Sequence, residues 1–433
     1  MSGFMIAAPH SGSGKTVMTL GILRALNMRG FAVASAKAGP DYIDPAFHAV
    51  ATGKPCINLD PWAMRDRLIL QLAGSQGRGN LLVVEAMMGL FDGAIDDTGS
   101  AADLASLLGL PIVFVVDVSR MGQSVAALVA GYQNHRPDIS VAGLILNRVG
   151  SARHRHMLER ALAPLNIPIL GIVPGDRALS LPSRHLGLVQ ASEKQGLESF
   201  VAGAAGLVEA HCDLEQMTSM ESKVSKAGSI GAGKTCALKP LGQSIAIARD
   251  QAFSFLYPHL LDGWRSQGAS VSFFSPLADE APHRDADVVF LPGGYPELHA
   301  GRLAGNDQFR AGMNAAAGRS ALIYGECGGY MVLGDAIIDD QGVLHRMLGL
   351  LPVTTTFAEK TRHLGYRRLS ASAVPGWEAD MRGHEFHYTS VVKSGEAPPL
   401  FHAHDAANND LGPVGQKVGH VMGSYMHVID RAA

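Results

Sequence analysis

Short apolar runs recur along the first half of the chain, and each is followed by a longer stretch with helix-compatible spacing. A short apolar run bounded by turn residues is typical of a buried strand. Strands that alternate with helices predict a parallel sheet covered on both faces. The runs occupy residues 4–8, 32–34, 81–84, 112–116, 143–146 and 169–173.

The same alternation returns in the second half, with apolar runs at residues 244–248, 271–274, 288–291 and 321–324. Between about residues 209 and 242 the periodicity fails, and Met, Ser, Lys and Gly dominate. A chain of 433 residues is also too long for one ordinary core. We therefore predict two α/β domains, at 1–210 and 243–433, joined by a linker at 211–242.

Composition changes this picture little. A net charge of -3 provides no basic field for nucleic acid, and no apolar run approaches the ~18 residues that a membrane span needs. The four cysteines, Cys56, Cys212, Cys236 and Cys327, have no C-x-x-C spacing, which favours a reducing compartment over a disulfide framework. We expect a cytoplasmic protein that binds neither nucleic acid nor membrane.

The first apolar run leads into a Gly/Ser turn that ends in Lys-Thr, and a Leu-rich helical stretch follows. In such a loop the backbone N–H groups surround phosphates, Lys15 contacts the outer phosphates and Thr16 offers its hydroxyl to Mg²⁺. Pro9 replaces the first glycine of the usual pattern. The predicted ATP-binding residues are Ser11, Gly12, Ser13, Gly14, Lys15 and Thr16.

Residues 228–235 satisfy the phosphate-loop pattern letter for letter. No apolar strand precedes them, and Pro240 follows too soon for a supporting helix. We reject this second match as a phosphate site.

Carboxylates follow the second and third predicted strands, where ligands of parallel sheets gather. Asp41 and Asp44 lie in one loop, and Glu85 and Asp92 lie in the next. These residues suit Mg²⁺ coordination and the handling of a second substrate, with Glu85 in the position of a Walker-B acid. The alternative is that the three aspartates cap helices or stabilise turns. Asn147, at the end of a later strand, could read an adenine edge or satisfy a turn.

The chemistry of the second half centres on Cys327, in a G-x-C-x-G pattern directly after a strand. This pattern predicts a nucleophile elbow with an exposed sulfur at a helix start, which favours the thiolate. Backbone N–H groups of Gly328 and of Gly294, in the Pro-Gly-Gly loop, could stabilise an oxyanion.

His427, near the end of the chain, is the strongest candidate for the base that activates the cysteine. His384 and His387 compete for this role. A weaker alternative use of histidine is metal binding by the His402-Ala403-His404-Asp405 segment.

A cysteine hydrolase joined to a nucleotide site suggests one coupled reaction. The second domain would release ammonia from glutamine, and the first would activate a carboxylate as an acyl phosphate for ammonia to attack. The product would be an amide. Free ammonia is mostly protonated near neutral pH, so we expect an internal passage for it.

Six motifs resemble those of the cobyrinic/hydrogenobyrinic acid a,c-diamide synthases. In that family Pro9 is part of the pattern. The resemblance implies a dethiobiotin-synthetase-like P-loop domain with a parallel sheet, followed by a class I (triad) glutamine amidotransferase α/β domain. It also implies ATP- and Mg²⁺-dependent amidation of the a and c acetate side chains of a corrin ring, with two glutamines. The motifs lie at residues 8–16, 37–45, 85–93, 181–188, 248–255 and 383–388.

The same resemblance assigns roles residue by residue. Cys327 would be the nucleophile and His427 its activator. Thr16, Asp41 and Glu85 would hold Mg²⁺. Tyr42, Asp44 and Asp92 would contact the corrin substrate.

Two positions depart from the family pattern. Ala86 stands where the family usually has Gly, and Ile429 stands where triad amidotransferases have a Glu. Asp430 and Glu385 are therefore the candidates to orient His427.

Three other interpretations remain at this stage. The substrate could be cobalt-containing cobyrinic acid, although overall likeness favours cobalt-free hydrogenobyrinic acid. Another tetrapyrrole could also be amidated. A protein of a different class would be a partitioning or scaffolding ATPase with an inactive amidotransferase domain. A homodimer is the default expectation for assembly.

Overall fold

The computed structural model describes residues 2–175, 183–184, 187–188, 196–220 and 237–432. The chain divides into unit 1, residues 1–62 and 66–233, and unit 2, residues 63–65 and 234–433. The rejected phosphate-loop match at 228–235 and Cys236 lie outside the described residues. Part of the motif at 181–188 also lies outside them.

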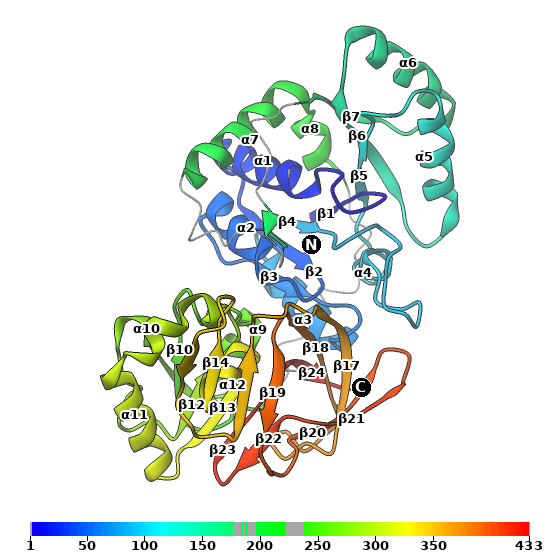
Figure 1. Cartoon of the computed structure of the whole chain (residues 1–433). Helices are drawn as coiled ribbons and strands as arrows, with labels where there is room; N and C mark the ends of the chain where they lie inside the picture. Colours follow the sequence, from blue (N-terminus) through cyan, green and yellow to red (C-terminus); the bar gives the residue numbers. More distant parts are fainter. Residues whose placement is uncertain (1, 176–182, 185–186, 189–195, 221–236, 433) are drawn as a thin grey trace. The chain divides into compact units, whose positions relative to one another are not determined.

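Unit 1 is built on a parallel sheet with strand order β3-β2-β4-β1-β5-β6-β7 (Figure 1). Its inner strands are buried along nearly their whole length, as expected for a sheet covered on both faces. The short strand β3 was not predicted. The strands are β1 (Ser2–Ala7), β2 (Val33–Ala38), β3 (Ile57–Leu59), β4 (Leu81–Glu85), β5 (Ile112–Asp117), β6 (Val141–Val149), β7 (Ile169–Pro174), and the separate pair β8 (Ser183–Arg184) and β9 (Gly187–Leu188).

Helices α1 and α7 lie side by side in unit 1, and both contribute buried residues to the core around β1 (Figure 1). Helix α8 falls inside the predicted linker, yet its Leu214 and Met217 belong to the same core. The helices of unit 1 are α1 (Lys15–Met28), α2 (Asp44–Thr52), α3 (Asp66–Gln76), α4 (Ala101–Leu108), α5 (Ser124–His135), α6 (Ala152–Leu162), the 3-10 turn η1 (Ala163–Leu165), α7 (Leu197–His211) and α8 (Leu214–Thr218).

Unit 2 contains a mainly parallel sheet with strand order β11-β10-β12-β13-β23-β22, in which only β22 is antiparallel to its neighbour. The predicted strands of the second half form its first four members. The strands are β10 (Ser244–Ala248), β11 (Ser270–Phe274), β12 (Val288–Leu291), β13 (Leu322–Glu326), β22 (Gln416–Val418) and β23 (Val421–Ser424).

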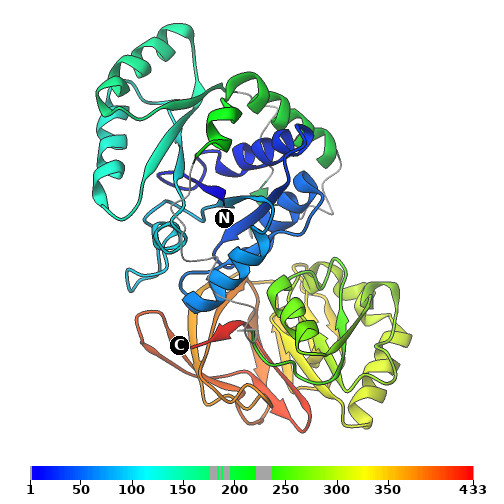
Figure 2. The same cartoon turned by 180° about the vertical axis from the view of Figure 1, so that it is seen from behind.

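The rest of unit 2 holds two further sheets that the sequence pattern did not predict. One is fully antiparallel, with order β21-β20-β17-β18-β24, and Figure 2 shows its orange and red strands beside the green and yellow helices of the unit. The other has order β15-β14-β16-β19. Their strands are β14 (Ala336–Ile338), β15 (Leu344–Arg346), β16 (Val353–Thr356), β17 (His363–Ser370), β18 (Met381–His387), β19 (Ser390–Ser394), β20 (Phe401–Asp405), β21 (Asp410–Val414) and β24 (Met426–Arg431).

The helices of unit 2 are short, and the last of them begins directly after Cys327. They are α9 (Pro258–Ser266), α10 (Ala300–Ala304), α11 (Asp307–Gly318) and α12 (Gly328–Leu333), with 3-10 turns η4 (Pro276–Ala278) and η5 (Pro296–His299).

The segment 63–65 belongs to unit 2 through one buried ion pair. Arg65 donates from Nε to Oδ2 of Asp430 at 2.9 Å and from Nη2 to Oδ1 at 2.9 Å. The Asp430 carboxylate is fully buried, so this bidentate contact compensates a charge that would otherwise be costly.

Among the described residues, no helix has the length and apolar character needed to cross a membrane.

Candidate active sites

The phosphate loop of unit 1 connects the end of β1 to the first residue of α1, as predicted. Gly12 and Gly14 have φ angles of 82° and 96°, which L side chains rarely adopt. A Cβ on Gly14 would also lie 2.3 Å from Nδ2 of Asn147. The loop therefore needs glycine at this position for its backbone angle and for the close approach of Asn147.

Asn147 stabilises the loop directly. Its Nδ2 donates to the carbonyl oxygen of Ser13 at 2.9 Å. This contact supports the alternative in which Asn147 satisfies local backbone, and a role in reading adenine stays a prediction.

Lys15 is buried at the loop, and its Nζ donates to the carbonyl oxygens of Met88 at 2.5 Å and His10 at 3.3 Å. Burial lowers the pKa of Lys15 to about 8, although the charge of Glu85 opposes this shift. Phosphate oxygens bind an ammonium more strongly than neutral carbonyls do. The lysine is thus placed where an incoming phosphate can replace its carbonyl partners.

Glu85 is fully buried at the end of β4 and is surrounded by donors. Its Oε1 accepts from Oγ1 of Thr16 at 2.7 Å and from Nζ of Lys37 at 2.9 Å. Its Oε2 lies 2.6 Å from Nε2 of His48. Burial alone would raise the pKa of Glu85, but Lys37 and His48 outweigh it and hold the pKa well below its usual value. The carboxylate is therefore ionised.

Lys37 and His48 are the residues of this site that sequence reasoning missed. Burial would lower the pKa of Lys37, but Asp44, whose Oδ2 is 2.5 Å from Nζ, and Glu85 raise it above its usual value. For His48, contacts with Cys56 and Glu85 outweigh burial and raise the pKa to about 10. Lys37 opens the quoted motif at residues 37–45, which is the signal that could have identified it.

The hydroxyl of Thr16 and the carboxylate of Glu85 form a pair of oxygen ligands of the kind that Mg²⁺ prefers. Their contact fits the predicted metal site, and the prediction itself stays open. Asp41 is placed differently, because its Oδ1 accepts from the backbone N–H groups of Ile43 and Asp44 at the start of α2.

The remaining predicted substrate residues lie in the same two loops. The Oδ2 atom of Asp92 accepts from the backbone N–H of Gly89 at 2.7 Å, which is a turn-stabilising contact. Tyr42 is half-buried between Asp41 and Asp44. The contacts of Asp41 and Asp92 support the turn and cap interpretation, whereas Asp44 pairs with Lys37. The roles of Tyr42, Asp44 and Asp92 toward substrate stay predictions.

In unit 2, Cys327 occupies the predicted strand-to-helix turn between β13 and α12. Its φ of 48° and ψ of -106° are unusual for a residue with a side chain, as in a nucleophile elbow. A Cβ on Gly329 would lie 1.9 Å from the carbonyl oxygen of Leu291. The second glycine of the motif thus permits the close approach of α12 to β12.

The expectation of an exposed sulfur was wrong. Cys327 is only 3% exposed, and burial raises the pKa of its thiol, with the charge of Glu297 adding to the effect. The backbone N–H of Gly328 opposes this shift, as a helix start should, but does not overcome it. The thiol therefore needs a base to become nucleophilic.

His427 lies next to Cys327. A Cβ on Gly293 would lie 2.4 Å from Cε1 of His427 and 3.3 Å from Cβ of Cys327, so both side chains pack against this glycine. Burial, with the nearby His384 and His387, lowers the pKa of His427 well below its usual value. A neutral imidazole is the form that can accept a proton.

A third group near this pair is Glu326, which sequence reasoning missed although it directly precedes Cys327. Its Oε1 accepts from the hydroxyl of Tyr324 and from the backbone N–H of Val428, each at 3.2 Å. Its Oε2 lies 3.9 Å from Nδ1 of His427, too far for a direct hydrogen bond but close enough to orient the ring electrostatically. Burial raises the pKa of Glu326 to about 8.

The two carboxylates suggested from sequence to orient His427 have other partners. Asp430 pairs with Arg65, and Glu385 pairs with Arg367 and His387. Glu326, with Oε2 at 3.9 Å from Nδ1 of His427, is therefore a further candidate to orient the imidazole, and this role stays a prediction.

The two histidines that compete with His427 for the role of base, His384 and His387, lie near it. His384 has its ring centroid 4.8 Å from that of His427, and burial lowers its pKa to about 3. His387 stacks on Tyr425 with centroids 3.7 Å apart and binds Glu385 through Nε2 at 2.8 Å. The packing of Gly293 between Cys327 and His427 favours His427 as the base.

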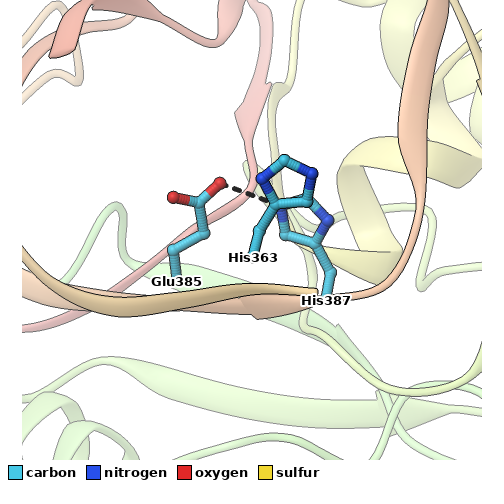
Figure 3. Close-up of side chains that lie close together, drawn as sticks. All are labelled: His363, Glu385 and His387. Carbon is cyan, nitrogen blue, oxygen red and sulfur yellow. Dashed lines mark hydrogen bonds and ion pairs between the residues drawn. The ribbon is translucent and has the colours of Figure 1, made fainter. Parts of the chain in front are cut away.

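Figure 3 shows His387 with Glu385 and His363, whose nitrogen and oxygen atoms lie within 4.8 Å of one another. The two rings stack at 4.6 Å with an angle of 14°. Arg367 already neutralises Glu385, at 2.7 Å, so the group has the contacts of a salt-bridged cluster. A second group contains His402 and His404, as predicted, but with Asp410 as its acid, which lies 2.7 Å from His402.

The predicted oxyanion donors lie together. A Cβ on Gly328 would be 3.2 Å from the backbone nitrogen of Gly294. The backbones of these two glycines therefore approach each other closely, and their role as oxyanion donors stays a prediction.

Two family models match the chain, one in each half. Residues 4–189 match the CobQ/CobB/MinD/ParA nucleotide binding domain, and residues 244–432 match the CobB/CobQ-like glutamine amidotransferase domain. With the phosphate loop and the cysteine elbow, these matches define an ATP-using glutamine amidotransferase, and they confirm the predicted fold class.

Relatives that align with the full length of the chain identify its family. Proteins named hydrogenobyrinate a,c-diamide synthase from Brucella anthropi and Rhizobium meliloti are each 56% identical to this chain, over 99% of both chains. The chain therefore belongs to the hydrogenobyrinate a,c-diamide synthase family, which confirms the resemblance seen in its motifs. A solved structure of PurLQS from Thermotoga maritima matches 42% of this chain and 86% of its own, at 16% identity and a TM-score of 0.31.

We predict that Gly293→Ala abolishes most glutamine hydrolysis, because the added methyl group would displace His427 from Cys327. Displacement of about 1 Å can reduce a rate about 100-fold. Glutaminase assays should show this loss, while amidation driven by ammonium salts is retained.

Gly318→Ala is the matched control, because a Cβ there meets no neighbouring atom. Unchanged glutamine hydrolysis in Gly293→Ala would contradict the pairing of Cys327 and His427.

Proposed function

We propose that the protein amidates the a and c carboxylates of hydrogenobyrinic acid, with ATP and glutamine, in cobalamin biosynthesis. The observation that carries this proposal is one chain that holds a phosphate loop facing Glu85 and an elbow cysteine beside His427. The names of the full-length relatives support the substrate. A cytoplasmic location and a homodimer are part of the proposal.

In the amidotransferase unit, His427 takes the thiol proton and Sγ of Cys327 attacks the carboxamide carbon of glutamine. N–H groups of Gly294 and Gly328 stabilise the oxyanion. The C–N bond then breaks, and His427 returns the proton to the leaving ammonia. Water hydrolyses the thioester to glutamate. Glu326 keeps the imidazole oriented through both transfers.

In the nucleotide unit, the phosphate loop and Lys15 hold the outer phosphates of ATP. A substrate carboxylate attacks the γ-phosphorus, ADP leaves, and ammonia then displaces phosphate from the acyl phosphate. Thr16, Glu85 and Asp41 would hold Mg²⁺, which would neutralise charge on the phosphates. Lys37 keeps Glu85 and Asp44 in place through its two short contacts.

The substrate contacts in the proposal are those of the two loops that follow β2 and β4. Tyr42 would lie against the ring, and Asp44 and Asp92 would position the acetate side chains. Asn147 would reach the adenine while it holds the Ser13 carbonyl.

Two alternative functions differ in what they require of the catalytic groups. Cobalt-containing cobyrinic acid, or another tetrapyrrole carboxylate, would require the same catalytic groups. A partitioning or scaffolding ATPase with an inactive amidotransferase domain is disfavoured, because the elbow and its histidine are intact.

We expect the purified protein to convert hydrogenobyrinic acid to its diamide when supplied with ATP, Mg²⁺ and glutamine. Mass spectrometry of the product measures this conversion. Parallel incubations contain cobyrinic acid in place of hydrogenobyrinic acid, or omit ATP. Hydrolysis of glutamine with no ATP consumption on any tetrapyrrole carboxylate would refute the proposed function.

For Cys327→Ala we predict loss of glutamine-dependent amidation and retention of amidation with ammonium salts, because only the source of ammonia is removed. Product formation with each nitrogen source is the measurement. If the variant still makes product from glutamine, Cys327 is not the nucleophile.

For Glu85→Gln we predict a loss of at least about 100-fold with either nitrogen source, because the variant weakens the metal site that both reactions need. Thermal unfolding checks that the variant folds, and Glu159→Gln, a half-buried acid on α6 that pairs with Arg155, is the control. Preserved ammonia-driven turnover would remove Glu85 from the metal site.

A further inference from the structure

One short segment of the chain, Ala63–Arg65, lies between two parts of the nucleotide unit in sequence but belongs to the amidotransferase unit. Besides the two side-chain contacts described above, the backbone N–H of Arg65 donates to Oδ2 of Asp430 at 3.1 Å. The Asp430 carboxylate is fully buried on β24. Breaking this pair would leave a buried charge uncompensated, so the contact holds both partners in one geometry.

Strand β24 carries His427 as well as Asp430, three residues apart. The strand pairs with β18, and the backbone N–H of Val428 donates to Oε1 of Glu326 at 3.2 Å. The position of the imidazole beside Cys327 is therefore set by the position of β24, which Arg65 holds near its end.

On its other side, the segment follows Trp62, which is anchored in the nucleotide unit. Trp62 is 1% exposed, and its Nε1 donates to Oδ2 of Asp96 at 3.3 Å. A Cβ on Gly99 would lie 2.5 Å from Cβ of Trp62, so the two backbones pack closely. Only Ala63 and Met64, both buried, separate this anchor from the ion pair. Two residues offer few backbone angles that could absorb a displacement.

Strand β3, which ends shortly before Trp62, is tied to the loop that carries Asp41. The backbone N–H of Gly39 donates to the carbonyl oxygen of Leu59 at 2.9 Å. The buried Nδ2 of Asn58 donates to the carbonyl oxygens of Gly39 at 3.0 Å and Asp41 at 2.6 Å. A displacement of this loop would therefore move β3 and the residues that follow it.

We propose that Arg65 is a positioning residue for glutamine hydrolysis, which acts on His427 through Asp430. Through this link, ligands bound at the Asp41 loop set the position of the imidazole beside Cys327. The link suits the chemistry, because ammonia released before a carboxylate is activated would be lost. The inference rests on the proposed function, since that function assigns ATP, Mg²⁺ and the corrin acid to this loop.

The test measures glutamine hydrolysis with and without ligands of the nucleotide unit. The ligands are Mg²⁺ and a non-hydrolysable ATP analogue, alone and together with hydrogenobyrinic acid, so that no amidation takes place. The variants are Arg65→Lys, Arg65→Ala and an insertion of two glycines between Trp62 and Ala63. The insertion adds length to the segment and leaves the ion pair intact. Arg67→Ala, which replaces an exposed arginine on α3, is the matched control.

We expect the ligands to raise the wild-type kcat for glutamine hydrolysis about 5-fold or more, within the usual range of coupling between sites. The KM for glutamine should change little, because the chemical step is affected. Arg65→Ala and the insertion should abolish this ligand effect. Arg65→Lys should retain part of it, because it keeps the charge but loses the bidentate contact. Arg67→Ala should behave as the wild type.

A merely structural role for Arg65 would lower kcat by the same factor with and without ligands, and the ligand effect would survive. That result would overturn the inference, as would a wild-type rate that neither set of ligands changes. Thermal unfolding identifies variants that do not fold. If Arg65→Ala is among them, Arg65→Lys and the insertion, which keep a cation at Asp430, decide the question.

Amidation with ammonium salts, measured for every variant, separates this inference from the proposed function. A wild type that forms the diamide from ammonium salts, but whose glutamine hydrolysis ignores the ligands, removes only the role of Arg65. A wild type that forms no diamide from either nitrogen source removes the proposed function. The response to Mg²⁺ and the ATP analogue alone then still tests Arg65.

Discussion

The compensation of the buried Glu85 carboxylate is the interaction on which the nucleotide unit depends. An isolated ion in this position would be strongly destabilising, so its neighbours must supply charge and hydrogen bonds. Lys37 comes from β2, His48 from α2 and Thr16 from α1, and all three bind this one side chain. The contacts fix the carboxyl ends of β2 and β4 against the start of α1. The phosphate loop is thereby positioned before any nucleotide binds.

Much of the fold followed from the sequence because buried parallel strands are continuous apolar runs, and those runs were visible in both halves. The two further sheets of unit 2 were not visible in the pattern. Strand β17, for example, has mostly half-buried residues, and its mixture of His, Tyr, Arg and Ser shows no clear alternation. Its position is fixed by pairing with β18, the next strand along the chain, and with β20, which lies further on. Pairing of this kind leaves little local pattern.

The candidate sites, like the fold, were predicted only in part from the sequence. Cys327 and the phosphate loop were found because local backbone conformation dictates their residue types: glycines at positive φ, and small residues around a strained turn. Glu326 and Lys37 were missed because their roles come from contacts across strands. The error about the exposure of Cys327 has a similar origin. An elbow sets the backbone of the cysteine, whereas burial of its sulfur depends on Gly293 and on the residues of β18, such as the Phe386 carbonyl at 3.8 Å.

Two buried acids, Glu85 in unit 1 and Glu326 in unit 2, are compensated to different degrees, and this difference matches the chemistry proposed for each. Glu85 is surrounded by donors that hold its pKa low, so it stays ionised, as the proposed metal site requires. Glu326 and Glu297 lack a comparable partner, and burial raises their pKa values to about 8 and about 7. An acid near its neutral point responds strongly to a cation that comes close. A protonated His427 would favour ionisation of Glu326. For this acid, charge compensation is thus left to the proposed reaction itself.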